Sequence, residues 1–154
     1  MRRSQMRLAH ARRRGVTTVE FAIACPIAFF LIFATIVGGL GVYRYHQVAA
    51  LAREGARYAS VHGADYEEDT ANPGATPEEI YNVAIVPRAV GLDLDQLSYS
   101  VTWDENNEPL TVHEDFETPI GNTVTVTVTY QWFPEMYLAG PFVLTSTSTV
   151  QMMY

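Results

Sequence analysis

The sequence has no lysine and a single cysteine among its 154 residues. One cysteine cannot close an internal disulfide, so cysteine usage does not indicate a redox compartment. The length suits one domain and excludes a multi-domain enzyme or a solenoid of several repeats. The hydrophobic fraction of 48% is too high for a disordered chain. We therefore expect one folded domain of ordinary size.

Catalytic motifs are missing as well. The sequence has no phosphate-binding loop, no HExxH, no GxSxG and no cysteine cluster. The four histidines are scattered, and the only local group of imidazole and carboxylates is His113 with Glu114 and Asp115. On a loop or an edge strand such a group is usually solvated, and a metal contact is the lesser alternative. We expect a protein that is not an enzyme and that holds no metal or cofactor.

Positive charge is concentrated at the N-terminus. Residues 1–14 hold six of the ten arginines and no acid, whereas residues 15–154 hold four arginines and all seventeen acidic residues. Residues 15–154 are too acidic to bind nucleic acid through a basic globular surface. The asymmetry indicates a membrane protein instead.

Residues 21–43 form an apolar run without one formal charge. About twenty helical residues span a bilayer core of roughly 30 Å. A buried core helix is the alternative, but a globule of this size needs no helix that is apolar all round for such a length. A removable secretory signal is the weaker interpretation, because its apolar part is usually only about 7–15 residues long and no small-residue cleavage site follows this run. The run predicts a membrane-spanning helix.

Arginine placement predicts the orientation of that helix. Only Arg44 follows the apolar run closely, whereas three consecutive arginines precede it: Arg12, Arg13 and Arg14. Positively charged flanks stay in the cytoplasm. We therefore expect a single-pass protein of the inner (cytoplasmic) membrane, with a cytoplasmic N-terminus and residues 44–154 outside.

Glu20 lies one residue before the apolar run and five residues after Gly15. A carboxylate at the edge of a membrane helix is costly and is usually functional. The plainer alternative is an interfacial acid at the helix N-terminus, where the helix dipole favours it. That alternative accounts for Glu20 alone, but not for its combination with Gly15 and the arginines.

The segment RRRGVTTVEF at residues 12–21, followed by an apolar helix, resembles a class III (type IV prepilin) signal. In that class a membrane peptidase cuts after the glycine on the cytoplasmic side, so the resemblance implies cleavage between Gly15 and Val16. A glutamate at the fifth mature position is a second mark of the class and matches Glu20. The aromatic Phe21 directly after it is similar to the Flp-type, or tight-adherence, branch.

A second block, AREGARYA at residues 52–59, resembles the signature of TadE-like proteins, and the threonine–valine run at 123–130 is similar to the end of that family. The resemblance is specific over residues 12–62 and loose over 121–154. It implies a minor pilin or pseudopilin of a tight-adherence type IVb pilus or related secretion apparatus. The implied partners are a prepilin peptidase, other pilin or pseudopilin subunits, a membrane assembly platform and the lipid bilayer. The signature positions are Arg53, Glu54, Gly55 and Arg57.

A different class of function stays open beside it, namely an unprocessed, signal-anchored protein whose extracytoplasmic domain binds a ligand or partner. The AREGARYA block also has a plainer interpretation as an alanine-rich amphipathic helix packed on its own domain, and the two interpretations are compatible.

The residues that resemble a prepilin signal can also be explained in physical terms. A peptidase needs an accessible, extended backbone; Gly15 has no side chain to obstruct it, and the β-branched residues 16–19 weakly disfavour a helix. Cleavage would leave an α-amino group on Val16, and an uncompensated charge between packed apolar helices is expensive. Glu20 of the same or a neighbouring subunit can neutralise that amine. We predict that Glu20 sets axial register during assembly.

The sequence predicts three parts: a basic leader at 1–15, a transmembrane helix at 16–43 and an extracytoplasmic domain at 44–154. In the domain, a helix over 44–61 has one apolar stripe, with Glu54 and Arg57 on its other side close enough to pair. The stripe consists of Val48, Leu51, Ala52, Gly55 and Ala59.

A short helix is predicted over 77–90, with Thr76 as its N-cap and Glu79 completing a capping box. Its apolar face is expected to hold Ile80, Val83, Ala84 and Pro87. The acidic residues of 62–76 and 104–109 could attract a cation, but the first group lacks EF-hand spacing, and solvated loops are the better interpretation of both.

Alternating apolar residues predict strands at about 97–103, 122–132 and 143–152. The facing of the last strand is ambiguous, because serine and threonine occur at so many of its positions. Three or four strands cannot bury an apolar face alone, and the helix at 44–61 supplies the missing layer. The expected fold class is α+β: a long N-terminal helix, transmembrane and then amphipathic, packed on a small antiparallel sheet in a pilin-like outline.

Overall fold

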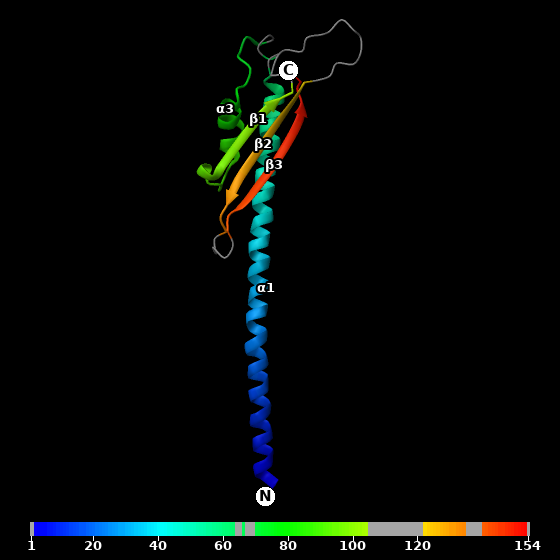
Figure 1. Ribbon diagram of the computed structural model, residues 1–154, viewed down its shortest axis with the longest axis vertical. Coiled ribbons are helices and arrows are strands. Elements are labelled where there is room, and N and C mark those ends of the chain that lie inside the picture. Colours follow the sequence, from blue (N-terminus) through cyan, green and yellow to red (C-terminus); the bar gives the residue numbers. More distant parts are fainter. Residues whose placement is uncertain (1, 64–65, 67–69, 105–121, 135–139, 154) are drawn as a thin grey trace. The chain divides into compact units, whose positions relative to one another are not determined.

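In the computed structural model (Figure 1), the protein consists of two compact units, Met1–Leu40 and Gly41–Tyr154. Side chains are described from Val16 onward. The residues that the structure describes are 2–63, 66, 70–104, 122–134 and 140–153.

One helix, α1 (Arg2–Val61), makes up the described part of the first unit and continues into the second. Residues 15–19 are helical, so the weak preference of the β-branched residues 16–19 against a helix does not decide their conformation. The physical reason is cooperativity: extending an existing helix adds one hydrogen bond per residue, and each β-branched residue opposes that by well under about 1 kcal/mol.

The sheet of the second unit has three antiparallel strands in the order β1-β2-β3. They are β1 (Leu97–Trp103), β2 (Thr123–Trp132) and β3 (Phe142–Gln151). Leu97 lies opposite Tyr130 in the first pair, and Trp132 lies opposite Phe142 in the second. The valines of β2, alternating with threonines, are completely buried. Each strand lies within about one residue of its predicted bounds.

The structure resolves the facing of β3. Its inward positions, Leu144 to Val150 in steps of two, are half-buried, and the residues between them are exposed. The exposed threonines of β3 share hydroxyl hydrogen bonds with threonines of β2, at oxygen–oxygen distances of 2.8–3.1 Å. The pairs are Thr125–Thr149, Thr127–Thr147 and Thr129–Thr145. The outer face of the sheet is therefore an ordered array of hydroxyl groups.

The second-unit part of α1 covers the other face of the sheet. Every residue of the predicted stripe is buried: Val48, Leu51, Ala52, Gly55 and Ala59. The core consists of this stripe together with the inward side chains of the strands and of the short helical segment. The predicted α+β class, a long N-terminal helix packed on a small antiparallel sheet, is confirmed.

The short helix differs from the prediction. Thr76 caps it as expected, since its hydroxyl accepts a hydrogen bond from the Glu79 N–H at 3.2 Å. The helical segment then changes type twice, and it ends at Arg88 instead of residue 90. Its three pieces are α3 (Pro77–Glu79), the π-helical η1 (Ile80–Ile85) and the 3₁₀-helical η2 (Val86–Arg88).

The π-helical turn changes which residues face the core. In a π-helix the hydrogen bond joins residues five apart, as the Val86 N–H and the Tyr81 carbonyl do here. Ile80 and Ile85 are therefore both buried, whereas Val83 is 48% exposed. The predicted face, which includes Val83 and Pro87, is wrong in those two positions because it assumes α-helical spacing.

Candidate processing segment and signature helix

The candidate processing segment lies on α1 in the first unit. Val16 and Phe21 are 65% and 69% exposed, and Glu20 is exposed too. Gly15 is helical, and the side chains of Arg12, Arg13 and Arg14 lie outside the described residues. Because Val16 and Glu20 are four residues apart on a helix, they share one face, about 6 Å apart along the axis.

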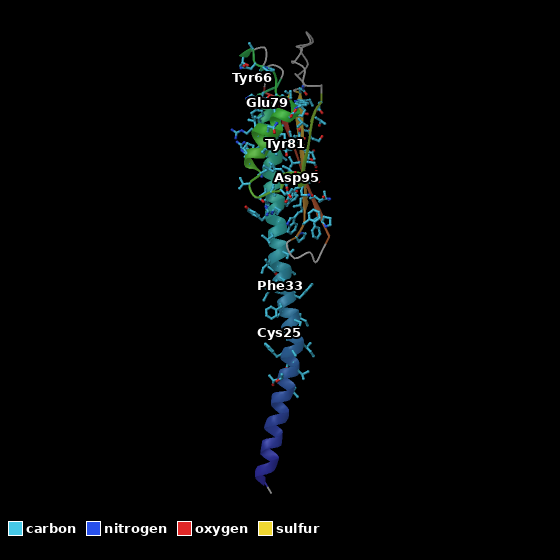
Figure 2. All side chains as sticks on the ribbon, turned by 90° about the vertical axis from the view of Figure 1, so that its left-hand side faces the viewer. Cys25, Phe33, Tyr66, Glu79, Tyr81 and Asp95 are labelled. Carbon is cyan, nitrogen blue, oxygen red and sulfur yellow. The ribbon has the colours of Figure 1, made fainter. Side chains whose placement is uncertain are left out.

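The apolar part of α1 meets the requirements of a membrane span. Among the described residues, this is the one helix long and apolar enough to cross a bilayer, and none of its most apolar window is buried within the chain. Side chains such as Cys25 and Phe33 project from the helix (Figure 2). The hydroxyl of Thr35 donates to the carbonyl oxygen of Leu31 at 2.8 Å, which satisfies a polar group that lipid cannot. The helix is consistent with a single-pass membrane anchor.

Gly55 lies at the junction of α1 with the sheet and with η1. A Cβ atom placed on Gly55 would be 3.1 Å from Val126 Cγ1 and 3.3 Å from Ile85 Cδ1. Both neighbours are completely buried, so neither can move aside freely. The glycine of the signature therefore allows the helix to approach β2 and η1 at a distance at which even a methyl group would press against both neighbours.

Glu54 pairs with a residue that the sequence did not predict. Its carboxylate lies 3.7 Å from the guanidinium of Arg88, at the end of η2. The predicted pairing with Arg57 is wrong: among the residues that the structure describes, Arg88 is the ion-pair partner of Glu54. Arg88 also donates to the Ala84 carbonyl oxygen at 3.2 Å, which fixes its guanidinium beside α1. Arg53 and Arg57 are exposed.

Tyr58 joins the end of α1 to the short helix. Its hydroxyl donates to Glu79 Oε1 at 3.3 Å, and its ring stacks on the His62 imidazole with 4.1 Å between centroids (Figure 2 labels Glu79). Burial raises the pKa of Tyr58, and the negative charge of Glu79 raises it further. The same Glu79 was predicted from the sequence only as part of a capping box.

Two hydrogen bonds near the start of the second unit have no signal in the sequence. Arg44 Nη1 donates to the Gly91 carbonyl oxygen at 2.6 Å, and Gln47 Nε2 donates to the Val90 carbonyl oxygen at 3.2 Å. Gly91 has a φ of +75°, which glycine adopts without strain. In the sequence, the position of Gly91 after the short helix indicates where that helix ends. It does not indicate that Arg44 binds there.

The possible cation sites receive no support from the described residues. Within that part of the chain, no three histidine, cysteine, aspartate or glutamate side chains come together as a metal site would require. The remaining candidates lie outside the described residues: Asp65, Glu67, Glu68, Asp69, residues 105–109 and the group of His113, Glu114 and Asp115.

An exposed apolar helix that continues into a small α+β domain is consistent with a class of proteins that have a single-pass membrane anchor. Comparison with known families makes the assignment more specific: the TadE-like protein family model matches residues 15–57. This match confirms the predicted resemblance to TadE-like proteins over these residues. No curated protein and no solved structure matches the chain.

The matched region begins at Gly15 and ends at Arg57, so it contains the candidate cleavage position, the apolar run and the four signature positions. A TadE-like domain indicates involvement in Tad pilus-related processes, as a component that interacts with other pilus proteins.

Proposed function

We propose that this protein is a minor pilin or pseudopilin of a tight-adherence type IVb pilus or related secretion apparatus. It is a substrate of a prepilin peptidase, which cuts after Gly15, and it has no enzymatic activity of its own. The observation that carries the proposal is the coincidence, on the single helix α1, of the prepilin-like segment, the exposed apolar span and the TadE-like match over residues 15–57.

The helical backbone at Gly15 implies a requirement for processing. A peptidase binds its substrate extended, so the first turns of α1 must unwind before the bond between Gly15 and Val16 is cut. Glycine lowers that cost, because it stabilises a helix by about 1 kcal/mol less than alanine does. The basic leader keeps the cut on the cytoplasmic face, and the apolar helix stays in the inner membrane as a single-pass anchor.

Cleavage creates the positive charge that Glu20 can neutralise. The new α-amino group of Val16 lies one helical turn from the Glu20 carboxylate on the same face of α1. When helices pack side by side away from water, an unpaired amine there is strongly unfavourable. A subunit therefore docks stably only where a carboxylate, its own or a neighbour's, reaches that amine. Phe21 follows Glu20 and adds apolar contact beside the pair.

The role of Glu20 is tested by Glu20→Ala and Glu20→Gln, expressed in cells that make the native apparatus. Both variants should be cleaved to the same extent as the wild type and should fail to enter sheared pili or the membrane assembly complex. Glu78→Gln, which removes an exposed carboxylate from the other unit, is the matched control and should assemble normally. Normal incorporation of Glu20→Ala would remove the proposed role in register.

A further inference from the structure

An aromatic group lies at one end of the sheet, where β2 ends and β3 begins. The ring of Trp132 packs against the backbone of Gly41, where an added Cβ atom would be 2.9 Å from Trp132 Cζ3. Phe142 lies opposite Trp132 in the register of the strands, and their ring centroids are 5.9 Å apart. This end of the sheet therefore lies at the level of Gly41 on α1.

Gly41 belongs to the apolar run, which continues to Tyr43 and ends before Arg44. If the run lies in lipid, as the proposed function requires, the boundary of the bilayer falls at about these residues. The end of the sheet is held beside the same residues, and so it has to lie at that boundary. This placement follows from contacts inside the second unit alone.

The side chains at this level are apolar and exposed. On the sheet side, Phe133 and Phe142 are each 46% exposed and Val143 is 64% exposed. Arg44 and Gln47 donate hydrogen bonds to the carbonyl oxygens of Gly91 and Val90, and this turn places Val90, which is 76% exposed, at the same level of α1. We call this group the apolar collar: Val42, Tyr43, Val90, Phe133, Phe142 and Val143.

The charge of the chain limits which kinds of surface can lie against the apolar collar. Residues 15–154 carry seventeen acids and four arginines, so most of this surface is repelled by anionic lipid headgroups. The described residues between Trp132 and Val143 include no acid, and Arg44 is the first charged residue after the apolar run; the exposed acids Asp93 and Asp95 follow the turn at Val90. Tyrosine is one of the two aromatic residues that membrane–water interfaces favour, and Tyr43 of the collar lies next to Arg44.

We propose that the apolar collar rests in the interfacial layer of the bilayer, so that lipid covers it and fixes the height of the domain above the membrane. The inference depends on the proposed membrane anchor. It adds a second lipid contact, made by the end of the sheet and by the turn at Val90, which are distant in sequence from the membrane helix.

The two tryptophans of the chain provide a built-in test. Trp103 lies opposite Val124 and Trp132 lies eight residues further along β2, about 26 Å away at roughly 3.3 Å per residue. Trp103→Phe leaves Trp132 as the only reporter, and Trp132→Phe leaves Trp103. The full-length variants are reconstituted at low protein-to-lipid ratio in phosphatidylcholine vesicles with or without bromine on the upper acyl chain, because bromine quenches indole fluorescence only at short range.

The collar predicts that brominated lipid quenches Trp132 and leaves Trp103 unchanged. Equal intensities in both kinds of vesicle for Trp132, in a chain that resists alkaline extraction, would overturn the collar and leave the anchor intact. Quenching of both tryptophans would also overturn it, since the domain would then lie flat on the membrane. Release of the chain by alkali would instead contradict the proposed anchor itself.

A second copy of the chain is the competing occupant of the same surface. It would protect Trp132 from bromine as the protein-to-lipid ratio rises, whereas a collar in lipid gives quenching that is independent of that ratio. Protection that increases with protein density would therefore assign the collar to a subunit contact and overturn the lipid proposal.

Discussion

Gly55 of α1 faces Val126 of β2 so closely that a Cβ atom on the glycine would be 3.1 Å from Val126 Cγ1. The contact explains one position of the TadE-like signature in physical terms. A glycine in mid-helix is unfavourable in isolation, and here it is kept because helix, strand and π-helical turn converge on the same point. The signature block therefore has a packing role within its own domain, whatever other contacts it makes.

The first prediction concerns this contact. Gly55→Ala gains about 1 kcal/mol of helix propensity but introduces an overlap that typically costs about 1–3 kcal/mol in a packed core. We expect a net loss of stability, and a larger loss for Gly55→Val. The measurement is the thermal unfolding midpoint of the detergent-solubilised chain.

Gly39→Ala is the matched control for Gly55, because an added Cβ atom at Gly39 meets nothing within 4 Å. It should be neutral or slightly stabilising. In a Val126→Ala background, the penalty of Gly55→Ala should shrink, since the overlapping methyl group is gone. A Gly55→Ala protein that is more stable than the wild type would show that the junction has more room than the structure gives it.

The second prediction concerns the Glu54–Arg88 ion pair. The two side chains are 38% and 52% exposed, respectively, so solvent screening limits their coupling to about 0.2–1 kcal/mol. A double-mutant cycle with Glu54→Gln and Arg88→Gln should give a coupling in that range. The parallel cycle with Arg57→Gln in place of Arg88→Gln should give none. Coupling to Arg57 instead of Arg88 would restore the pairing that helical spacing alone suggests.

The third prediction follows from the raised pKa of Tyr58. The unfolded chain loses the phenolic proton at about pH 10, before the folded chain does. The folded state then binds more protons than the unfolded state, and stability falls as the pH rises from about 10 through the folded pKa of Tyr58. Below pH 10 this contribution is fully present.

Denaturation midpoints at pH 8 and at pH 11 test the behaviour of Tyr58. The loss between the two should be smaller in Tyr58→Phe than in the wild type, although Tyr58→Phe is itself less stable at pH 8 because the hydrogen bond to Glu79 is missing. Tyr45→Phe, which removes an exposed tyrosine of the same helix, should lose as much as the wild type. An identical alkaline loss in Tyr58→Phe would contradict the assignment.

The strands were predictable because their signal is local. Valine and threonine alternate along β2 with the same period as its two faces, so the sequence pattern and the burial pattern coincide. The facing of β3 was ambiguous for the opposite reason: serines lie inward and threonines outward, and neither residue type prefers one side strongly.

The misjudged features all depend on contacts distant in sequence or on helix type. Ile85 replaces Val83 in the core because of a π-helical turn, which α-helical spacing cannot indicate. Glu54 pairs with Arg88, thirty-four positions away, although Arg57 is nearer in sequence. The hydrogen bond from Arg44 to the Gly91 carbonyl oxygen likewise forms only when the chain has folded.

The candidate processing segment was easier to recognise than its conformation. Its marks, Gly15 and Glu20, are local and can be read from the sequence alone. Its backbone follows the long helix around it, and so the weak tendency of residues 16–19 against a helix is overridden. The proposed partner of Glu20 is an amine that exists only after cleavage.

The central claim is that the leader is removed while the apolar helix stays, and the mass of the intact mature chain tests it most directly. The chain is extracted with detergent from the membranes of cells that express the native apparatus. We predict a mature protein that begins at Val16, and a Gly15→Leu variant that keeps residues 1–15. A wild-type chain that still begins at Met1, or one cut near residue 43, would contradict the account and favour a signal-anchored or secreted binding protein.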